Sequence, residues 1–162
     1  MVVKRYYRPS PIMTQNRTKG YRKMKNITVA LCTDERGGMM FNKRRQSRDR
    51  VLIAELVNST EEKIYISRYS RLLFEPHIDR VVICDDPIRE CGEGDVCFVE
   101  DTPILPYIDD ISRLVIYNWN RRYPYDVELG IEPSEIGFTK VSETEFAGSS
   151  HEKITKGVYE RK

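Results

Sequence analysis

The sequence lacks any apolar run close to the roughly 20 residues that a membrane-spanning helix needs. No apolar segment of the signal-peptide kind follows the basic N-terminus. Metal ligands are scarce as well, because there are two histidines and no C-x-x-C pair, so no metal site is expected. Free thiols in a reduced, cytoplasmic protein are expected for the four cysteines, Cys32, Cys84, Cys91 and Cys97.

Acidic residues are missing from residues 1–23, which contain seven Lys and Arg. The rest of the chain holds 20 Lys and Arg against 25 Asp and Glu, so a domain of charge −5 follows a basic segment. Because periodic apolar residues are also scarce there, we expect a disordered N-terminal extension. It is either passive or a nucleic-acid-binding arm. Residues 24–162 are enough for a single domain.

Apolar runs and helical stretches alternate along that domain. Runs rich in β-branched residues predict strands, and periodic apolar stretches predict helices. The predicted strands are residues 26–33, 63–67, 79–85, 95–101 and 112–119, with helices at 48–57 and 68–75, a proline-started helical turn at 102–110 and a long loop at 34–47. Residues 137–148 and 151–161 predict a closing hairpin. The fold class is therefore α/β, with a central mixed β-sheet flanked by helices and an antiparallel C-terminal hairpin.

The stretch "KIYISRYSRLLFE", residues 63–75, holds a strand-to-helix join at Ser67 to Ser70. Ligands of such sheets bind at the carboxyl ends of the strands, beside helix N-termini. Arg68 and Ser70 are expected either to hold an anion or to be a helix cap with a solvated arginine.

Five stretches, taken in order, share the pattern of one family. They are "ITVALCTDERGGMMFN", "SRDRVLIAEL", "IYISRYSRLLF", "ILPYIDDISRLVIY" and "GFTKVSETEF" with the ending "GVYERK". Over about residues 26–161 their order and spacing resemble the dihydrofolate reductase family. The resemblance implies the same α/β fold and a single domain over residues 24–162.

The resemblance also implies roles for the first two stretches. Asp34 with Gly37 or Gly38 is similar to the mobile substrate loop after the first strand of the family. Asp49 matches the acid that grips the pterin ring, which makes it the implied catalytic residue. In the alternative interpretation, Asp49 is an acidic residue at the start of a helix that interacts favourably with the helix dipole.

The third stretch resembles the family's G-R-x-T join. Arg68 matches the residue that meets the 2′-phosphate of NADPH, and Ser70 stands for the Thr at its pyrophosphate, so Gly38, Arg68 and Ser70 are the implied cofactor residues. Ser67 replaces the glycine, and Glu100 and Asp101 replace the Gly-Gly that faces the phosphates. A carboxylate about 4 Å from a phosphate charge costs about 4 kcal/mol at an effective dielectric constant near 20.

These departures favour a pseudoenzyme: a divergent dihydrofolate reductase-like domain that binds a nucleotide, a nucleic acid or a protein. The alternative is an NADPH-dependent oxidoreductase acting on a pterin-like or other small heterocycle. An RNA-processing nuclease is a weaker alternative, because the zinc-ligand motif of a metallo-β-lactamase-type ribonuclease is missing. A magnesium nuclease would have to use the acid pairs Asp85 and Asp86 or Asp109 and Asp110.

Two further stretches predict binding surfaces. "NKRRQSRDR", residues 42–50, holds five basic residues and no aromatic one, which is either a phosphate-contacting patch or a solvated loop. "NWNRRYPYD", residues 118–126, predicts either a surface for an RNA or protein partner or packing at a strand end, through Trp119, Arg121, Arg122 and Tyr123. His151 is either catalytic or a solvated turn residue.

Overall fold

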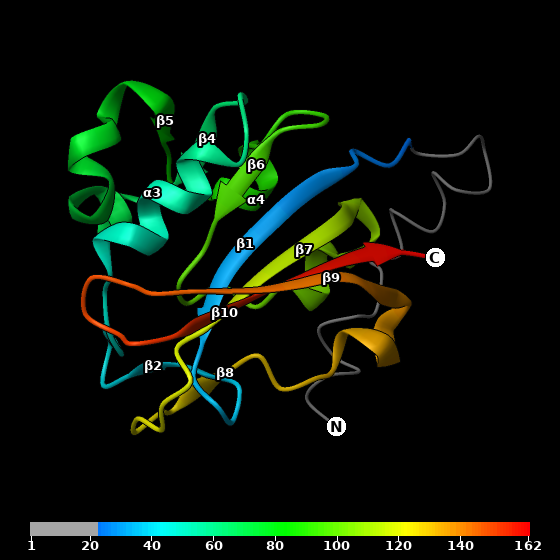
Figure 1. Ribbon diagram of the computed structural model, residues 1–162. Coiled ribbons are helices and arrows are strands. Elements are labelled where there is room, and N and C mark those ends of the chain that lie inside the picture. The colour runs from blue at the N-terminus through cyan, green and yellow to red at the C-terminus, as the bar shows by residue number, and fades with distance from the viewer. Residues whose placement is uncertain (1–22) are drawn as a thin grey trace.

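The computed structural model describes residues 23–162, so the extension expected at residues 1–23 lies, except for Lys23, outside the described residues. A seven-stranded sheet runs through the middle of the molecule in the order β5-β4-β6-β1-β7-β10-β9 (Figure 1). The strand bounds are β1 Ile27–Thr33, β4 Ile64–Ile66, β5 Val81–Ile83, β6 Val96–Phe98, β7 Ile111–Asn118, β9 Phe138–Phe146 and β10 Ile154–Arg161.

The sheet is mixed, with its antiparallel part at the C-terminal end of the chain. β1 pairs in parallel with β6 and β7, and β4 pairs in parallel with β5 and β6. β10 runs antiparallel to both β7 and β9. The mixed sheet and the closing hairpin predicted from the sequence are therefore confirmed.

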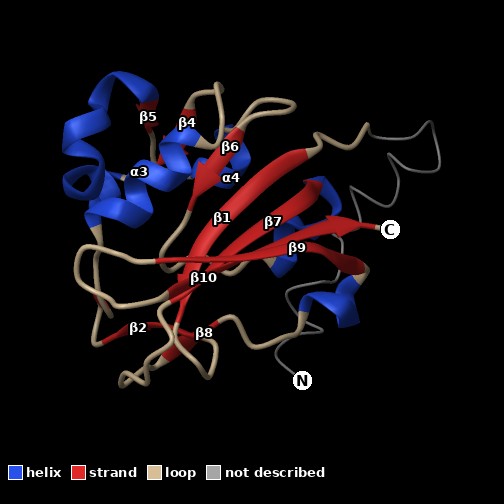
Figure 2. Ribbon diagram, in the orientation of Figure 1, coloured by secondary structure: helices blue, strands red, loops and turns tan. Residues whose placement is uncertain are grey.

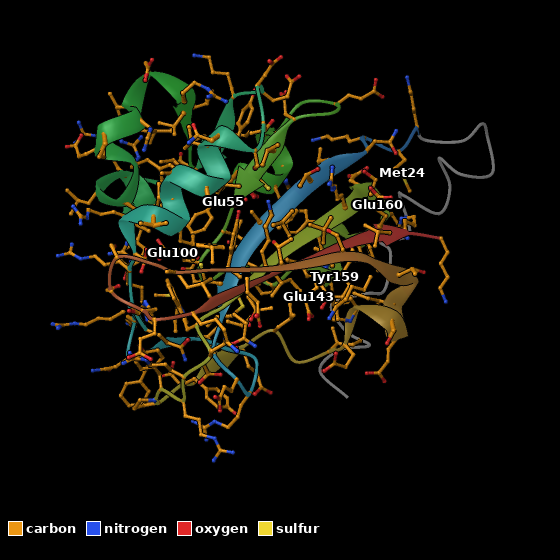
Figure 3. All side chains as sticks on the ribbon, viewed as in Figure 1. Met24, Glu55, Glu100, Glu143, Tyr159 and Glu160 are labelled. Atoms are coloured by element: carbon orange, nitrogen blue, oxygen red, sulfur yellow. The ribbon has the colours of Figure 1, made fainter. Side chains whose placement is uncertain are left out.

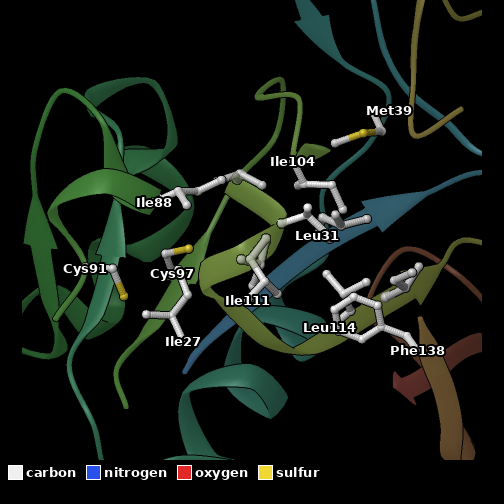
Figure 4. Close-up of a cluster of buried hydrophobic side chains, with 14 of the residues drawn as sticks. Ile27, Leu31, Met39, Ile88, Cys91, Cys97, Ile104, Ile111, Leu114 and Phe138 are labelled. Carbon is white, nitrogen blue, oxygen red and sulfur yellow. The ribbon is translucent and has the colours of Figure 1, made fainter. Parts of the chain in front are cut away.

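The central strand β1 is buried on both faces, which explains its continuous apolar run. Ile27, Val29 and Leu31 belong to one hydrophobic cluster, part of which Figure 4 shows. The alternate residues Ala30 and Cys32 belong to or pack against a second cluster. Successive side chains of a strand point to opposite faces, so the two clusters lie on opposite sides of the sheet.

Helices cover both faces of the sheet (Figure 2). α3 (Arg50–Asn58) packs on the face of Ala30, joined by Phe74 from the 3-10 helix η1 (Arg68–Arg80). α4 (Pro87–Glu90) and the 3-10 helix η2 (Leu105–Asp110) bring Ile88 and Ile108 to the other face. The helix predicted at residues 48–57 is confirmed. The one predicted at 68–75 is present as 3-10 helix, and beyond a kink at Pro76 and His77 a further helical turn ends at Arg80.

A second sheet of three strands, β3-β2-β8, overturns the prediction of a long loop at residues 34–47. Its strands are β2 (Gly38–Phe41), β3 (Arg44–Arg45) and β8 (Val127–Glu128), and the short 3-10 helix η3 (Pro133–Ile136) follows. Asn42 and Lys43 join β2 to β3 with φ angles of 51° and 61°. Two positive φ angles suit a type I′ hairpin turn, which usually carries Asn-Gly. Because Lys43 takes the place of that glycine, the sequence does not show the usual pattern of a hairpin turn.

Candidate functional site

Asp49 is the N-cap of α3, and its side chain is buried. Its Oδ1 accepts hydrogen bonds from the backbone N–H groups of Val51 (3.0 Å), Leu52 (3.2 Å) and Ser149 (2.9 Å). Its Oδ2 accepts from the N–H of Ser150 at 2.8 Å and from the Ser150 hydroxyl at 3.1 Å. Burial raises the pKa of the Asp49 carboxyl, but these N–H groups outweigh burial and hold the pKa well below its usual range. Both oxygens are used inside the protein, so they are not available to two N–H groups of a heterocycle.

His151 connects this carboxylate to two aromatic rings. Its Nδ1 lies 3.3 Å from Asp49 Oδ2, and its Nε2 lies 3.0 Å from Tyr123 Oη. The imidazole is buried and stacks on Trp119, with ring centroids 4.5 Å apart and planes at 23°. His151 is therefore not the solvated turn residue that the sequence left open. It ties the β9–β10 turn to the start of α3.

A cavity lies beside Asp49, between α3 and the sheet. Its apolar walls include Cys32, Leu52, Phe98 and Trp119. Its volume is about 20 Å³, which is room for about one water molecule. Small-molecule sites measure roughly 300–1,000 Å³. The cleft in which the resemblance places a pterin is thus closed by the protein's own side chains.

Glu100 lies at one edge of this cavity, where it forms an ion pair with Arg45 and accepts a hydrogen bond from Ser70. Its Oε1 lies 2.8 Å from Nε of Arg45, and its Oε2 accepts from a second nitrogen of the same guanidinium at 3.1 Å. The Ser70 hydroxyl donates to Glu100 Oε2 at 2.7 Å. Ser70 is fully buried, and Glu100 lies below α3 in the view of Figure 3. The hydroxyl expected at a cofactor phosphate is therefore bound to a carboxylate.

Arg68 lies in a separate open hollow of about 460 Å³, which we call the acidic hollow. Asp85, Asp86 and Asp101 line it together with Arg68. The Arg68 Nε lies 3.4 Å from Asp85 Oδ1, and both side chains are more than four-fifths exposed. An ion pair this exposed contributes little to stability. Three carboxylates around one paired arginine give this hollow a negative balance.

A third hollow, of about 500 Å³, has the opposite charge, and we call it the basic hollow. Its lining residues are Arg44, Arg45, Ser47, Arg48, Tyr69 and Ser150. Arg44 and Arg48 are exposed, and neither forms an ion pair with an acid within residues 23–162. Their charges are therefore available to a ligand, whereas that of Arg45 is taken by Glu100.

Gly38 packs away from all three hollows, at the start of β2. Its N–H donates to Asp34 Oδ1 at 2.8 Å, and Asp34 Oδ2 accepts from the Tyr123 N–H at 3.1 Å. A Cβ at Gly38 would lie 2.6 Å from Cγ of Tyr125. The glycine is needed here for close packing of β2 on Tyr125, and Asp34 holds the two segments together.

The aromatic and basic stretch at residues 118–126 is divided between interior and surface. Trp119 is 4% exposed, so its ring is packed on His151 and offers no stacking face to a partner. Arg121 and Arg122 are exposed. Arg122 Nε lies 3.4 Å from a carboxylate oxygen of Glu35.

The four residues implied by the resemblance do not meet in one cleft. Asp49 lines the closed cavity, Ser70 is bonded to Glu100 at its edge, Arg68 lines the acidic hollow, and Gly38 is part of the small sheet. The Arg45–Glu100 pair joins residues 55 positions apart, and no local sequence signal marks it.

Within residues 23–162 no group of three or more His, Cys, Asp or Glu side chains could hold a metal ion. Among the same residues, no helix has the length and apolar character needed to cross a membrane.

Comparison with known proteins identifies the fold. No model of a protein family matches the sequence, and no curated protein matches it. A solved structure, dihydrofolate reductase from Enterococcus faecalis complexed with NADP(H) and RAB-propyl, matches with a TM-score of 0.59. The match covers 85% of this chain and 97% of that one, at 10% sequence identity. The chain therefore has a dihydrofolate reductase-like fold, and at this identity the likeness is one of fold alone.

Proposed function

We propose that this chain of dihydrofolate reductase-like fold is a binding domain for a phosphate-bearing ligand, and not a folate reductase. The proposal rests on the contrast between two neighbouring regions that share Arg45, Ser47 and Arg48. The cavity beside Asp49 is a closed space of about 20 Å³, whereas the basic hollow outside it is an open depression of about 500 Å³ with two arginines that have no acidic partner within residues 23–162. Ligand binding is accordingly expected at the basic hollow.

NADPH, the cofactor that the resemblance implies, does not fit the residues at its expected place. Ser70 donates to Glu100, and Arg68 shares its hollow with Asp85, Asp86 and Asp101. A diphosphate there would meet carboxylates, each repelling it by up to about 4 kcal/mol at a separation near 4 Å. The same repulsion was expected from Glu100 and Asp101, and Asp85 and Asp86 add to it.

The chemistry of the basic hollow suits phosphate oxygens. Arg44 and Arg48 each present a planar guanidinium, which binds phosphate through paired N–H groups. Ser47 adds a hydroxyl group to the same lining. The Ser150 hydroxyl already donates inside the protein, to the Arg48 carbonyl and Asp49. Because both arginines are exposed, their attraction for an anion is screened by salt, and binding is expected to weaken as ionic strength rises.

Binding of a fluorescent nucleoside triphosphate analogue to arginine variants tests the proposal. Arg44→Ala and Arg48→Ala are each expected to weaken binding about fivefold, which corresponds to about 1 kcal/mol for an exposed charge pair. Arg68→Ala is the matched control, since it removes another exposed arginine, one that lies in the acidic hollow, and should leave binding unchanged. If Arg68→Ala weakens binding and the other two do not, the proposal is wrong.

The second candidate function is an NADPH-dependent reductase of a small heterocycle, favoured by the NADP(H) complex of the structural neighbour. Reductase activity would require the closed cavity to open and Asp49 to give up its hydrogen bonds to the protein. Because we propose a binding domain, we expect NADPH oxidation in the presence of dihydrofolate, followed by absorbance, to proceed no faster with the protein than without it. A rate that disappears in Asp49→Asn, with the fold retained, would favour the reductase.

A further inference from the structure

We propose that the ligand of the basic hollow is a single nucleic-acid strand, with one base stacked on Tyr69. The inference rests on the proposed phosphate binding and adds a base-binding platform to it. Tyr69 lines the basic hollow and is 41% exposed, although it is a large aromatic residue. An exposed, fixed aromatic ring beside unpaired arginines is the combination that binds single strands.

Three contacts with Arg45 hold the Tyr69 ring in place. The Arg45 guanidinium carbon lies over the ring, 4.4 Å from its centroid, which is a cation–π contact. This contact takes one face of the ring, so a base would stack on the opposite face. The Arg45 N–H donates to Tyr69 Oη at 2.9 Å, and its guanidinium donates to the Tyr69 carbonyl oxygen at 2.9 Å. Glu100 in turn fixes the guanidinium from the other side. The ring is therefore positioned before any ligand arrives, which lowers the entropic cost of stacking a base on it.

The fold supplies the aromatic residue that the basic run at residues 42–50 does not contain. Tyr69 comes from the start of η1, 24 residues after Arg45. Around this ring, Arg44 and Arg48 line the hollow, and Lys43 and Arg50 extend the same run as exposed bases. Within residues 23–162 all four of these bases lack an acidic partner. They are the groups that would meet the phosphates.

Charge on the far side of Tyr69 limits the path of the strand. Tyr69 also lines the acidic hollow, where Asp85, Asp86 and Asp101 repel phosphates. The backbone is therefore confined to the side of Arg44 and Arg48. A duplex keeps its bases stacked inside, whereas an unpaired strand can turn a base onto an aromatic ring, so the platform selects single strands.

The number of basic side chains sets the expected salt dependence. If Lys43, Arg44, Arg48 and Arg50 each neutralise a phosphate, the slope of log K against log salt is about −2.8 for a single strand. Affinity then falls about 50-fold between about 50 and about 200 mM salt. Whatever the basic segment at residues 1–23 contributes to the total slope is the same in every variant of the full chain.

Fluorescence anisotropy of the full chain with a labelled oligouridylate of about 12 nucleotides tests the inference. Tyr69→Ala is expected to weaken binding roughly 5- to 150-fold, the range for loss of one stacked base. Tyr69→Phe keeps the ring and should bind within about twofold of wild type. Tyr125→Ala is the matched control, because Tyr125 also faces an arginine, Arg36 at 5.0 Å, but lies outside the hollow. It should leave binding unchanged.

Two measurements distinguish base stacking on Tyr69 from the proposed phosphate binding: the salt dependence of affinity, and the affinity for a strand without bases. Arg44→Ala should reduce the slope by about 0.7, whereas Lys63→Ala, which removes an exposed base outside the hollow, should not. If an abasic strand or a duplex binds as tightly as oligouridylate and Tyr69→Ala has no effect, phosphate binding stands and the base platform is refuted. If neither oligouridylate nor the triphosphate analogue responds to Arg44→Ala, both proposals fail.

Discussion

Replacing Asp49 tests whether this residue serves the fold or a ligand. In the structure its carboxylate joins the first turn of α3 to the β9–β10 turn through six hydrogen bonds at most 3.3 Å long. Asp49→Ala removes all of them without adding a charge or bulk. We therefore expect a large loss of stability, and no change in ligand affinity that is independent of folding.

The magnitude follows from the contacts. Loss of the N-cap costs about 1 kcal/mol. Each N–H of Ser149 and Ser150 loses a hydrogen bond to a charged acceptor, worth about 1.5 kcal/mol at the lower end, although water can partly replace it because both serines are exposed. The sum is about 4 kcal/mol, which replacement by water reduces to about 3 kcal/mol. A loss of this size lowers Tm by roughly 6–12 °C in a domain of this size.

Urea unfolding followed by circular dichroism measures this loss at neutral pH, with Asp86→Ala as the matched control. Asp86 is the N-cap of α4, but it accepts only from Arg89 N–H at 3.4 Å and Tyr107 Oη at 3.1 Å, so about 1 kcal/mol is expected. If Asp49→Ala costs no more than Asp86→Ala, the structural role assigned to Asp49 is refuted.

The pH dependence supplies a second readout of the same residue. Folding lowers the pKa of Asp49, so its contribution is present above the unfolded value of about 3.9 and is lost as pH falls through the folded value. The stability gap between wild type and Asp49→Asn should accordingly narrow below about pH 4. A constant gap would mean that the charge of Asp49 contributes nothing.

Three further predictions concern buried residues. Trp119→Ala should cost about 3–5 kcal/mol in urea unfolding because the ring is buried, whereas a small loss would place it at the surface. Gly38→Ala should cost about 1–3 kcal/mol by pushing against Tyr125, and an unchanged urea midpoint would contradict the packing. Burial and the hydrogen bond to Glu55 raise the pKa of Tyr117 well above its usual range, so Tyr117→Phe should leave tyrosinate absorbance at about pH 11 unchanged. A drop in that absorbance would show that Tyr117 ionises in the folded protein.

The central strands β1, β6 and β7 could be predicted because they are buried on both faces and read as apolar runs. The exposed edge strand β9 could be predicted from the hairpin that it forms with β10. The small sheet could not, since its hairpin turn has Lys43 where a glycine would mark it. The acids that replace Gly-Gly were visible as residues, but the inward turn of Glu100 toward Ser70 and Arg45 depends on partners 30 and 55 positions away. Contacts across such distances are set by the packing of the whole domain.

The candidate site, too, has one part that could be predicted from the sequence and one part that depends on the folded chain. Arg44 and Arg48 belong to a basic run that the sequence displays, whereas Tyr69 reaches them only in the folded chain. Trp119, which the sequence left as either a binding surface or packing at a strand end, is buried against His151. Residue type and spacing predict that a surface is basic, but which aromatic ring joins it depends on tertiary structure.

Amide chemical-shift mapping during titration with pyrophosphate tests the central claim most directly. If the ligand site lies in the basic hollow, the largest shifts occur at Arg44, Ser47, Arg48 and Ser150, and the amides of Arg68 and Asp101 stay unchanged. The largest shifts at Arg68, Ser70 and Asp101 would contradict the claim, because they would place the anion at the cofactor edge of the reductase-like sheet.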